Sequence, residues 1–169
     1  MDILVIDGYN IIGDWEELRR LKRIEISHAR NRLIERLIEY QAYTGTKVII
    51  VFDAMHMKGI ESRKKQNNVE IIYTDEEETA DEYIERLVTS LINVKDKVYV
   101  ATSDYMEQRT IFSRGALRIS ARELQIEIEA MNKNISQQLE QNYSERPKTT
   151  IEMNKNILNK FEKWRRGHL

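Results

Sequence analysis

Three short, unbroken apolar runs constrain the fold of this chain more than any other feature. They cover residues 3–6 (Ile-Leu-Val-Ile), 48–52 (Val-Ile-Ile-Val-Phe) and 98–101 (Val-Tyr-Val-Ala). Runs that lack polar alternation are typical of strands buried on both faces, as in a parallel sheet. A weaker fourth run covers residues 69–73.

Amphipathic patterns lie between these runs, with apolar residues at helical spacing over residues 26–37 and 80–91. Strands that alternate with helices predict an α/β fold with an open, mostly parallel sheet and right-handed crossovers. After the last run we expect a short helix from about residue 104 to 112. A longer helix is marked by Leu124, Ile128, Met131, Ile135 and Leu139.

The length of 169 residues suits one well-buried core, which we place in a domain over residues 1–140. A polar stretch with Pro147 then breaks the pattern, and Thr149 and Glu152 have capping-box spacing before a terminal amphipathic helix. We therefore predict a linker and helix over residues 141–169. Packing on or beside the same domain is the expected role of that helix, and docking on a partner is the alternative.

Composition excludes several kinds of site. The chain has no Cys and only three dispersed His, which rules out disulfides, thiolate zinc sites and a Cys nucleophile and disfavours a His-rich metal cage. With 27 Lys+Arg against 28 Asp+Glu, the field of a strongly basic nucleic-acid binder is missing. The N-terminus lacks the pattern of a signal peptide or membrane span. We expect a cytoplasmic protein without membrane contact, and a monomer.

Acidic residues follow the predicted strands. Asp7 ends the first run, Asp53 ends the second, and Asp104 comes three residues after the last. Because the carboxyl ends of parallel strands share one edge, these side chains are expected to converge there. Asp81 lies in the first turn of the helix that begins near Thr79 and Glu82, and it joins the cluster if that helix starts at the same edge.

Clustered carboxylates repel one another unless a cation neutralises them. Oxygen ligands alone favour Mg²⁺ or Mn²⁺, bound by Asp7, Asp53, Asp81 and Asp104. Such a site suits phosphodiester hydrolysis, in which the metal activates water and stabilises the phosphoryl group. Taken singly, each Asp also suits a turn or helix cap, and Asp81 also suits the helix dipole.

Two polar residues next to the acids are candidate supporting groups. The amide of Asn10 suits a phosphate, a water, the Asp7 carboxylate or ordinary turn chemistry. Ser103, just before Asp104, suits a helix cap or a ligand contact. Tyr9 and Tyr105 suit either base stacking or core packing.

RNA approaches an acidic metal site only if cations surround it. The segments after Asp53 and Asp104 carry such cations, namely Lys58, Arg63, Lys64, Lys65, Arg109, Arg114, Arg118 and Arg122. We predict that they contact RNA phosphates, with a solvated charged face as the alternative. The net charge of -1 then conceals a separation of acidic and basic regions.

These features together make the chain resemble the YacP-like branch of the NYN domains, which are relatives of the PIN nucleases. The matching segments are Asp7-Gly8-Tyr9-Asn10, Val51-Phe52-Asp53-Ala54, Thr79-Ala80-Asp81-Glu82, Thr102-Ser103-Asp104, Gly115-Ala116-Leu117-Arg118, Ser120-Ala121-Arg122-Glu123 and Phe161-Glu162-Lys163-Trp164-Arg165-Arg166-Gly167. Each motif is short, and their order and strand contexts are what is specific.

The resemblance implies a PIN/NYN-like fold and a metal-dependent endoribonuclease that cuts mRNA in the A site of a translating ribosome. It implies Asp7 and Asp81 as central catalytic acids, with Asp53, Asp104 and Asn10 in support, and we include Asp104 among the catalytic candidates. Many PIN nucleases carry a further acid at this point, for which Glu107 is the nearby candidate, so the number of metal ions stays open.

Two other functions fit the same fold. A non-catalytic RNA- or ribosome-binding module would keep the acids for structure. A phosphoacceptor or phosphatase domain would use a strand-end Asp as nucleophile, but Tyr9 stands where the second acid of a haloacid dehalogenase is expected. Since the cations are modest in number, we expect weak activity on free RNA.

Overall fold

A six-stranded sheet organises the computed structural model of this chain, which describes residues 1–54, 62–93, 96–104, 109, 111–144, 159 and 163. The strands are β1 (Ile3–Asp7), β2 (Lys47–Phe52), β3 (Ser62–Gln66), β4 (Val69–Tyr73), β5 (Val98–Ala101) and β6 (Leu117–Ile119). Their order is β3-β4-β2-β1-β5-β6, and every neighbouring pair is parallel except β3 and β4. The predicted α/β class and mostly parallel sheet are confirmed, and the weak fourth run is β4.

The chain changes direction across the sheet between β1 and β5. It first builds β2 and β4 on one side of β1 and then adds β5 and β6 on the other. Ile6 of β1 lies opposite Ala101 of β5, so these strands end almost level. Open α/β sheets bind ligands at the carboxyl ends of the strands where the order reverses, which here is the gap between β1 and β5.

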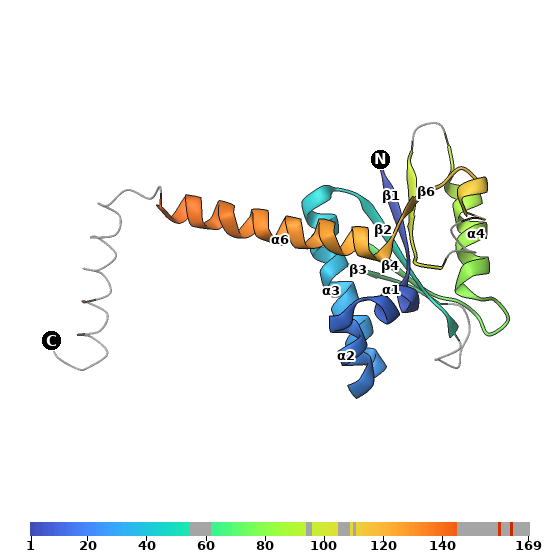
Figure 1. Cartoon of the computed structure of the whole chain (residues 1–169), viewed down its shortest axis with the longest axis horizontal. Coiled ribbons are helices and arrows are strands. Elements are labelled where there is room, and N and C mark those ends of the chain that lie inside the picture. The colour runs from blue at the N-terminus through green and yellow to red at the C-terminus, as the bar shows by residue number, and fades with distance from the viewer. Residues whose placement is uncertain are drawn as a thin grey trace. The chain divides into compact units, whose positions relative to one another are not determined.

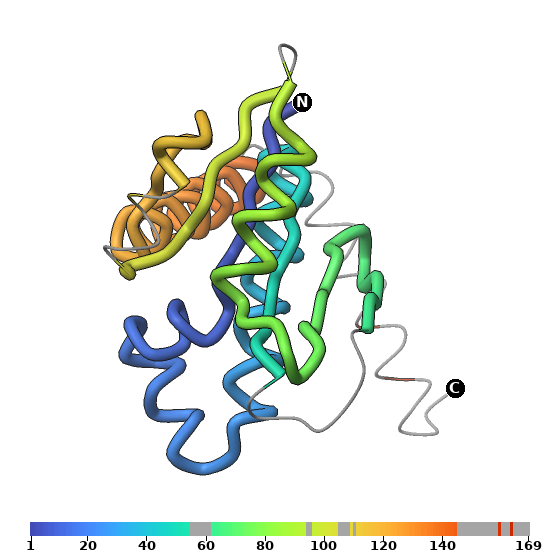
Figure 2. The backbone as a smooth tube through the Cα atoms, turned by 90° about the vertical axis from the view of Figure 1, so that its right-hand side faces the viewer, coloured from blue at the N-terminus to red at the C-terminus, as the bar shows by residue number. Residues whose placement is uncertain are grey.

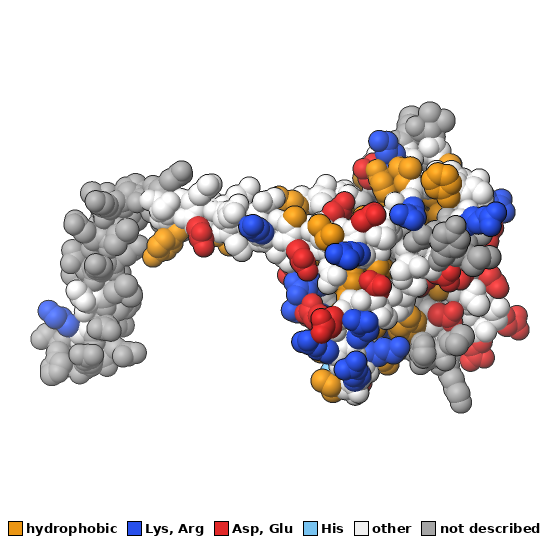
Figure 3. Space-filling view, viewed as in Figure 1, with side chains coloured by type: hydrophobic (Ala, Val, Ile, Leu, Met, Phe, Trp, Pro, Cys, Tyr) orange, Lys and Arg blue, Asp and Glu red, His pale blue; other side chains and the backbone are white. Residues whose placement is uncertain are grey.

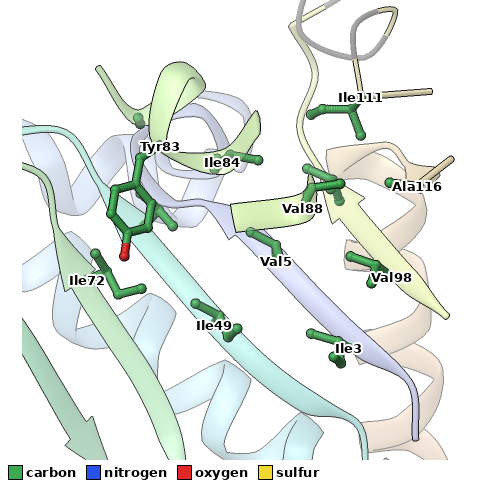
Figure 4. Close-up of a cluster of buried hydrophobic side chains, with 13 residues drawn as sticks. Ile3, Val5, Ile49, Ile72, Tyr83, Ile84, Val88, Val98, Ile111 and Ala116 are labelled. Carbon is green, nitrogen blue, oxygen red and sulfur yellow. The ribbon is translucent and has the colours of Figure 1, made fainter. Parts of the chain in front are cut away.

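Helices cover both faces of the sheet (Figure 1). The helices α1 (Gly8–Asp14), α2 (Glu16–Ile24) and α3 (Ile26–Thr44) lie on one face, and α4 (Ala80–Leu91) lies on the other. Alternate strand residues such as Val5 and Val51 pack with Tyr83 and Ile84 of α4 in one core cluster (Figure 4). The smooth trace in Figure 2 shows α4 crossing in front of the strands. Because strand side chains alternate between faces, Ile6 and Phe52 point toward α1 and α3.

Four elements, β3, β6, α1 and α2, were not predicted from the sequence. β3 reads Ser-Arg-Lys-Lys-Gln and is largely exposed at the sheet edge, so it has no apolar alternation to mark it. The two-residue turn after it, Asn67-Asn68, has φ values of 46° and 71°. Asn tolerates this left-handed conformation, and such turns join antiparallel strands. That Asn pair is the sequence signal for the β3–β4 hairpin.

The predicted long helix is α6 (Ala121–Ser144). Its first residues belong to the sheet domain, because the Trp15 indole Nε1 donates to the Ala121 carbonyl at 2.8 Å. The chain divides into two compact units, residues 1–131 and 132–169. The proposed division at residue 140 remains a proposal, since most of the predicted linker and terminal helix lies outside the described residues, as does most of the predicted helix 104–112.

None of the helices in the described part of the chain combines the length and apolarity needed to cross a membrane.

Candidate active site at the carboxyl ends of the strands

Asp7 is the last residue of β1 and is buried, with 7% of its surface exposed. Ile3 and Val5, four and two residues earlier, belong to the core cluster under α4, so strand alternation directs Asp7 toward the same face. A carboxylate that is buried at a strand end loses much of its hydration, so charged or hydrogen-bonding groups must offset that loss. Burial of this kind is more typical of a functional group than of an ordinary turn residue.

Asp53 brings the start of α4 to the same edge of the sheet. Its Oδ2 accepts a hydrogen bond from the Ala80 backbone N–H at 3.1 Å, and Thr79 caps the helix by accepting from the Glu82 N–H at 3.2 Å. Asp81 therefore lies in the first turn of a helix that begins at the carboxyl end of β2, which is the same edge of the sheet as the other acids. The Asp81 residue itself is exposed.

Asn10 and Ser103 connect the segments that follow β1 and β5. The Asn10 Oδ1 accepts from the Ser103 backbone N–H at 2.7 Å and from its hydroxyl at 2.8 Å. The next residue, Asp104, donates its N–H to the Thr102 hydroxyl at 3.1 Å. The two predicted supporting residues thus hold together the point where the strand order reverses, and they place Asp104 beside it.

The donor set is chemically suited to a hard divalent cation, because all the candidate groups are carboxylates. Within the ranges that the structure describes, however, no three His, Cys, Asp or Glu side chains are grouped so that they could hold a metal ion. The structure therefore does not bring Asp7, Asp53, Asp81 and Asp104 together as one ligand set; Asp53 bonds to the start of α4 and Asp81 faces outward. Mg²⁺ needs only one or two protein carboxylates with waters and substrate phosphates. An ion of this kind therefore does not require a group of three protein ligands.

A row of aromatic rings lies next to the acids. Tyr9 packs on Phe52 with ring centroids 5.1 Å apart, and Phe52 stacks on Tyr73 at 5.5 Å. Burial raises the pKa of the Tyr9 hydroxyl, the nearby Asp53 charge raises it further, and the hydrogen bond from Arg30 at 3.1 Å opposes both. Tyr9 therefore remains a neutral hydroxyl beside the acids at physiological pH.

Of the predicted RNA-binding cations that the structure describes, three lie on the edge strand β3 and others lie near the opposite edge of the sheet. On β3, Arg63 donates to the Tyr83 hydroxyl at 2.7 Å, Lys64 lies 5.9 Å from the Tyr73 ring centroid, and Lys65 is exposed. At the other edge, Arg114 and Arg118 form ion pairs with Glu85 and Glu123 at 3.1 and 3.9 Å. Arg109 and Arg122 are exposed. Lys58, Glu107 and Tyr105 are outside the described residues.

Thr74 and Arg30 support the site but were not predicted from the sequence. Thr74 is buried, its N–H donates to the Phe52 carbonyl, and its hydroxyl accepts from the Ala54 N–H at 3.0 Å, which fixes the chain around Asp53. A single Thr after a weak strand carries no pattern that could have revealed this. Arg30 lies on α3, 21 residues from the Tyr9 that it contacts, so only the tertiary structure joins them.

Comparison with known proteins agrees with this arrangement. The family described as YacP-like NYN domain matches residues 4–166. YacP of Bacillus subtilis (strain 168) is 49% identical over 169 residues, which is 100% of this chain and 99% of that protein. The crystal structure of Rae1 (YacP) from Bacillus subtilis has a TM-score of 0.75 at 49% identity, covering 100% of this chain and 97% of that one. A Trp-to-Leu mutant of it has a TM-score of 0.77 at 47% identity, covering 86% of each chain.

Proposed function

Because this chain belongs to the YacP-like NYN domain family, we propose that it is a metal-dependent endoribonuclease that hydrolyses phosphodiester bonds of mRNA at the A site of the translating ribosome. The family supports a nuclease and an RNA-related role. The observation that carries the proposal is the buried Asp7 at the reversal point of the sheet, with the start of α4 and Asp81 tied to the same edge by Asp53.

In this proposal Asp7 and Asp81 hold a Mg²⁺ or Mn²⁺ ion, with Asp104 as the third catalytic acid. A bound divalent ion would orient and activate water and stabilise charge on the phosphoryl group. Asp53 positions Asp81 by accepting a hydrogen bond from the first N–H of α4, and its negative charge helps to attract the metal ion. Asn10 positions Asp104 indirectly, by fixing the adjacent Ser103.

The cations of β3 are suited to binding RNA phosphates beside this edge. Lys64 and Lys65 are both exposed, so a phosphate can approach them from solvent. Arg114 and Arg118 are already paired with acids, which reduces the charge that they offer to RNA. With a net charge of -1, the chain has little general attraction for free RNA. We therefore propose that the ribosome positions the mRNA and that the protein acts on it as a cytoplasmic monomer.

The test is cleavage of a reporter mRNA in a purified translation system by the wild type and by the Asp7→Asn/Asp81→Asn variant. The wild type should cut and the variant should lose at least about 100-fold in rate, as expected when acids that stabilise a transition state are neutralised. The matched control is Asp14→Asn/Glu76→Gln, which removes the same charge from exposed positions and should cut normally.

If a folded Asp7→Asn/Asp81→Asn variant cuts as fast as the wild type, the catalytic assignment is wrong. If the wild type binds ribosomes but cuts nothing, the chain is the non-catalytic module. Rapid and specific cleavage of naked mRNA would contradict the dependence on the ribosome.

A further inference from the structure

Helix α2 carries more positive charge than its neighbours neutralise. Four cations lie within its nine residues, at positions 19, 20, 22 and 23, against two acids at positions 16 and 17. Both acids are paired with Arg side chains of this same chain. Glu16 accepts from Arg20 at 2.6 Å, and Glu17 accepts from Arg32 at 2.8 Å and from Arg36 at 3.2 Å.

The three other cations, Arg19, Lys22 and Arg23, are exposed and form no ion pair with any residue that the structure describes. Their spacing of three and four residues places them on one side of the helix, with neighbouring side chains about 5–6 Å apart. Glu17, which contacts α3, lies on a different side of α2. The side with the unpaired cations therefore faces away from α3 and toward solvent.

The helix dipole accounts for only part of this pattern. Lys22 and Arg23 are in the last turn, where a cation is favourable, but Arg19 is one turn earlier and gains little from that position. An ordinary solubilising surface would mix both signs of charge along this side. Here the acids are all at the start of the helix and are all paired, so its second half presents cations alone.

Position and chemistry indicate the partner. In Figures 1 and 2, α2 and its turn into α3 lie at the end of the sheet domain where the strands have their carboxyl ends, and Figure 3 shows Lys and Arg side chains gathered over α2. The aromatic residue next to α2, Trp15, is buried, and α2 itself has none, so this surface offers no aromatic ring on which unpaired bases could stack. A rigid row of cations without aromatics matches a regular phosphate backbone.

We propose that Arg19, Lys22 and Arg23 form a docking surface for the phosphate backbone of folded, base-paired RNA, separate from the site that holds the strand to be cut. The choice of RNA as partner rests on the proposed function. The surface supplies affinity for a large structured RNA, and the acidic edge supplies the chemistry.

The test measures binding to a base-paired RNA hairpin and to an unpaired RNA of equal length, over a range of salt concentrations. All proteins carry Asp7→Asn, so binding is measured without cleavage. The variant Lys22→Gln/Arg23→Gln should bind the hairpin roughly 10-fold more weakly at moderate salt, and its slope of log affinity against log salt should fall by about one for each cation removed. Binding to the unpaired RNA should change much less.

The control is Lys47→Gln/Lys97→Gln, which removes the same charge at the amino ends of the strands, where Lys47 pairs with Glu70 at 3.4 Å and Lys97 is exposed. This variant should retain hairpin affinity. Circular dichroism should show that all variants remain folded. Equal losses in both variants would show a general charge effect and would overturn the proposal, as would unchanged hairpin binding. Binding to vesicles of anionic lipid is measured as well. If the α2 variant keeps its affinity for the hairpin and loses only its binding to these vesicles, the proposal is also overturned.

The two proposals fail separately. A wild-type protein that cuts no RNA would contradict the nuclease, whereas hairpin binding that depends on α2 would still stand.

Discussion

The backbone at Gly8 lies so close to Phe52 that no side chain fits between them. A Cβ atom at this position would be 2.3 Å from Cε1 and 2.4 Å from Cδ1 of Phe52. The ring has nowhere to move, because Phe52 is fully buried and packed between Tyr9 and Tyr73. We predict that Gly8→Ala lowers the free energy of unfolding by about 1–3 kcal/mol, which urea denaturation measures.

Gly13 is the matched control for this substitution, because it lies in the same helix and a Cβ there meets nothing within 4 Å. Gly13→Ala should leave stability unchanged or raise it by up to about 1 kcal/mol, since Ala is the better helix former. If both variants are equally destabilised, the cause is not the contact with Phe52.

At the residue scale, candidate site residues could be predicted where an apolar run marks the end of a strand. Asp7 and Asp53 could be located because unbroken apolar runs stop there. The bond between Asn10 and Ser103 could not be foreseen, since it joins residues 93 positions apart and depends on the pairing of β1 with β5. The outward position of Asp81 also follows from the packing of α4 rather than from any local pattern.

Two side chains accept hydrogen bonds from N–H groups at the start of α4, and substituting them separately distinguishes a structural role from a catalytic one. Thr79 accepts from the Glu82 N–H, and Asp53 accepts from the Ala80 N–H. Asp53→Asn keeps an oxygen acceptor but removes the charge, so we predict nearly normal stability with reduced cleavage. Asp53→Ala should lose about 0.5–2 kcal/mol of stability as well, as other cap removals do. Urea denaturation and the translation assay measure the two effects.

Thr79→Ala is the control for the cap alone. It should lose about 0.5–2 kcal/mol of stability and cut at a nearly normal rate when folded. Normal cleavage by Asp53→Asn would mean that Asp53 acts only as a helix cap.

Elements were predictable from the sequence when their burial was uniform. β1, β2 and β5 have buried apolar residues on both faces. Each therefore appears in the sequence as a short, unbroken apolar run, whereas a helix with one buried face would show apolar residues only at every third or fourth position. β3 is an exposed edge strand, and β6 has only one buried residue among three, so neither shows an apolar pattern. α2 was overlooked because Leu18 is its one buried residue.

In the sheet domain as a whole, a hydrogen bond connects the helix α3 with the first half of α6. The Tyr40 hydroxyl donates to Glu127 at 3.0 Å. Burial and then this bond raise the pKa of Tyr40 well above its usual range. Because the folded pKa is the higher one, the stabilisation is complete below the ordinary Tyr pKa of about 10 and is lost as the pH rises beyond it.

Tyr40→Phe should therefore lower the free energy of unfolding by about 0.5–1.5 kcal/mol at neutral pH and flatten the loss of stability above pH 10. Urea denaturation from pH 7 to 11 measures both. Tyr43→Phe, at a position with 46% exposure, should keep the wild-type profile. An unchanged alkaline profile in Tyr40→Phe would show that another group governs it.

Metal binding should also be visible in the stability of the whole domain, independently of catalysis. An ion that binds only the folded state raises the free energy of unfolding by about 1.4 kcal/mol at roughly ten times its Kd. For a chain of this size that is a rise of about 3–5 °C in Tm. The wild type should show it on addition of Mg²⁺ or Mn²⁺ and lose it on chelation, and differential scanning calorimetry measures the change.

The Asp7→Asn/Asp81→Asn variant should not respond to the ion, and its metal-free Tm should equal or exceed that of the wild type, because the substitution removes mutual repulsion between carboxylates. Asp14→Asn/Glu76→Gln should respond as the wild type does. An equal rise in all three proteins would indicate binding to the general surface. The described residues offer no group of three ligands, so substrate phosphates are the remaining source of metal ligands. If the metal ion raises the Tm of the wild type only when an uncut RNA is bound, those phosphates complete the site.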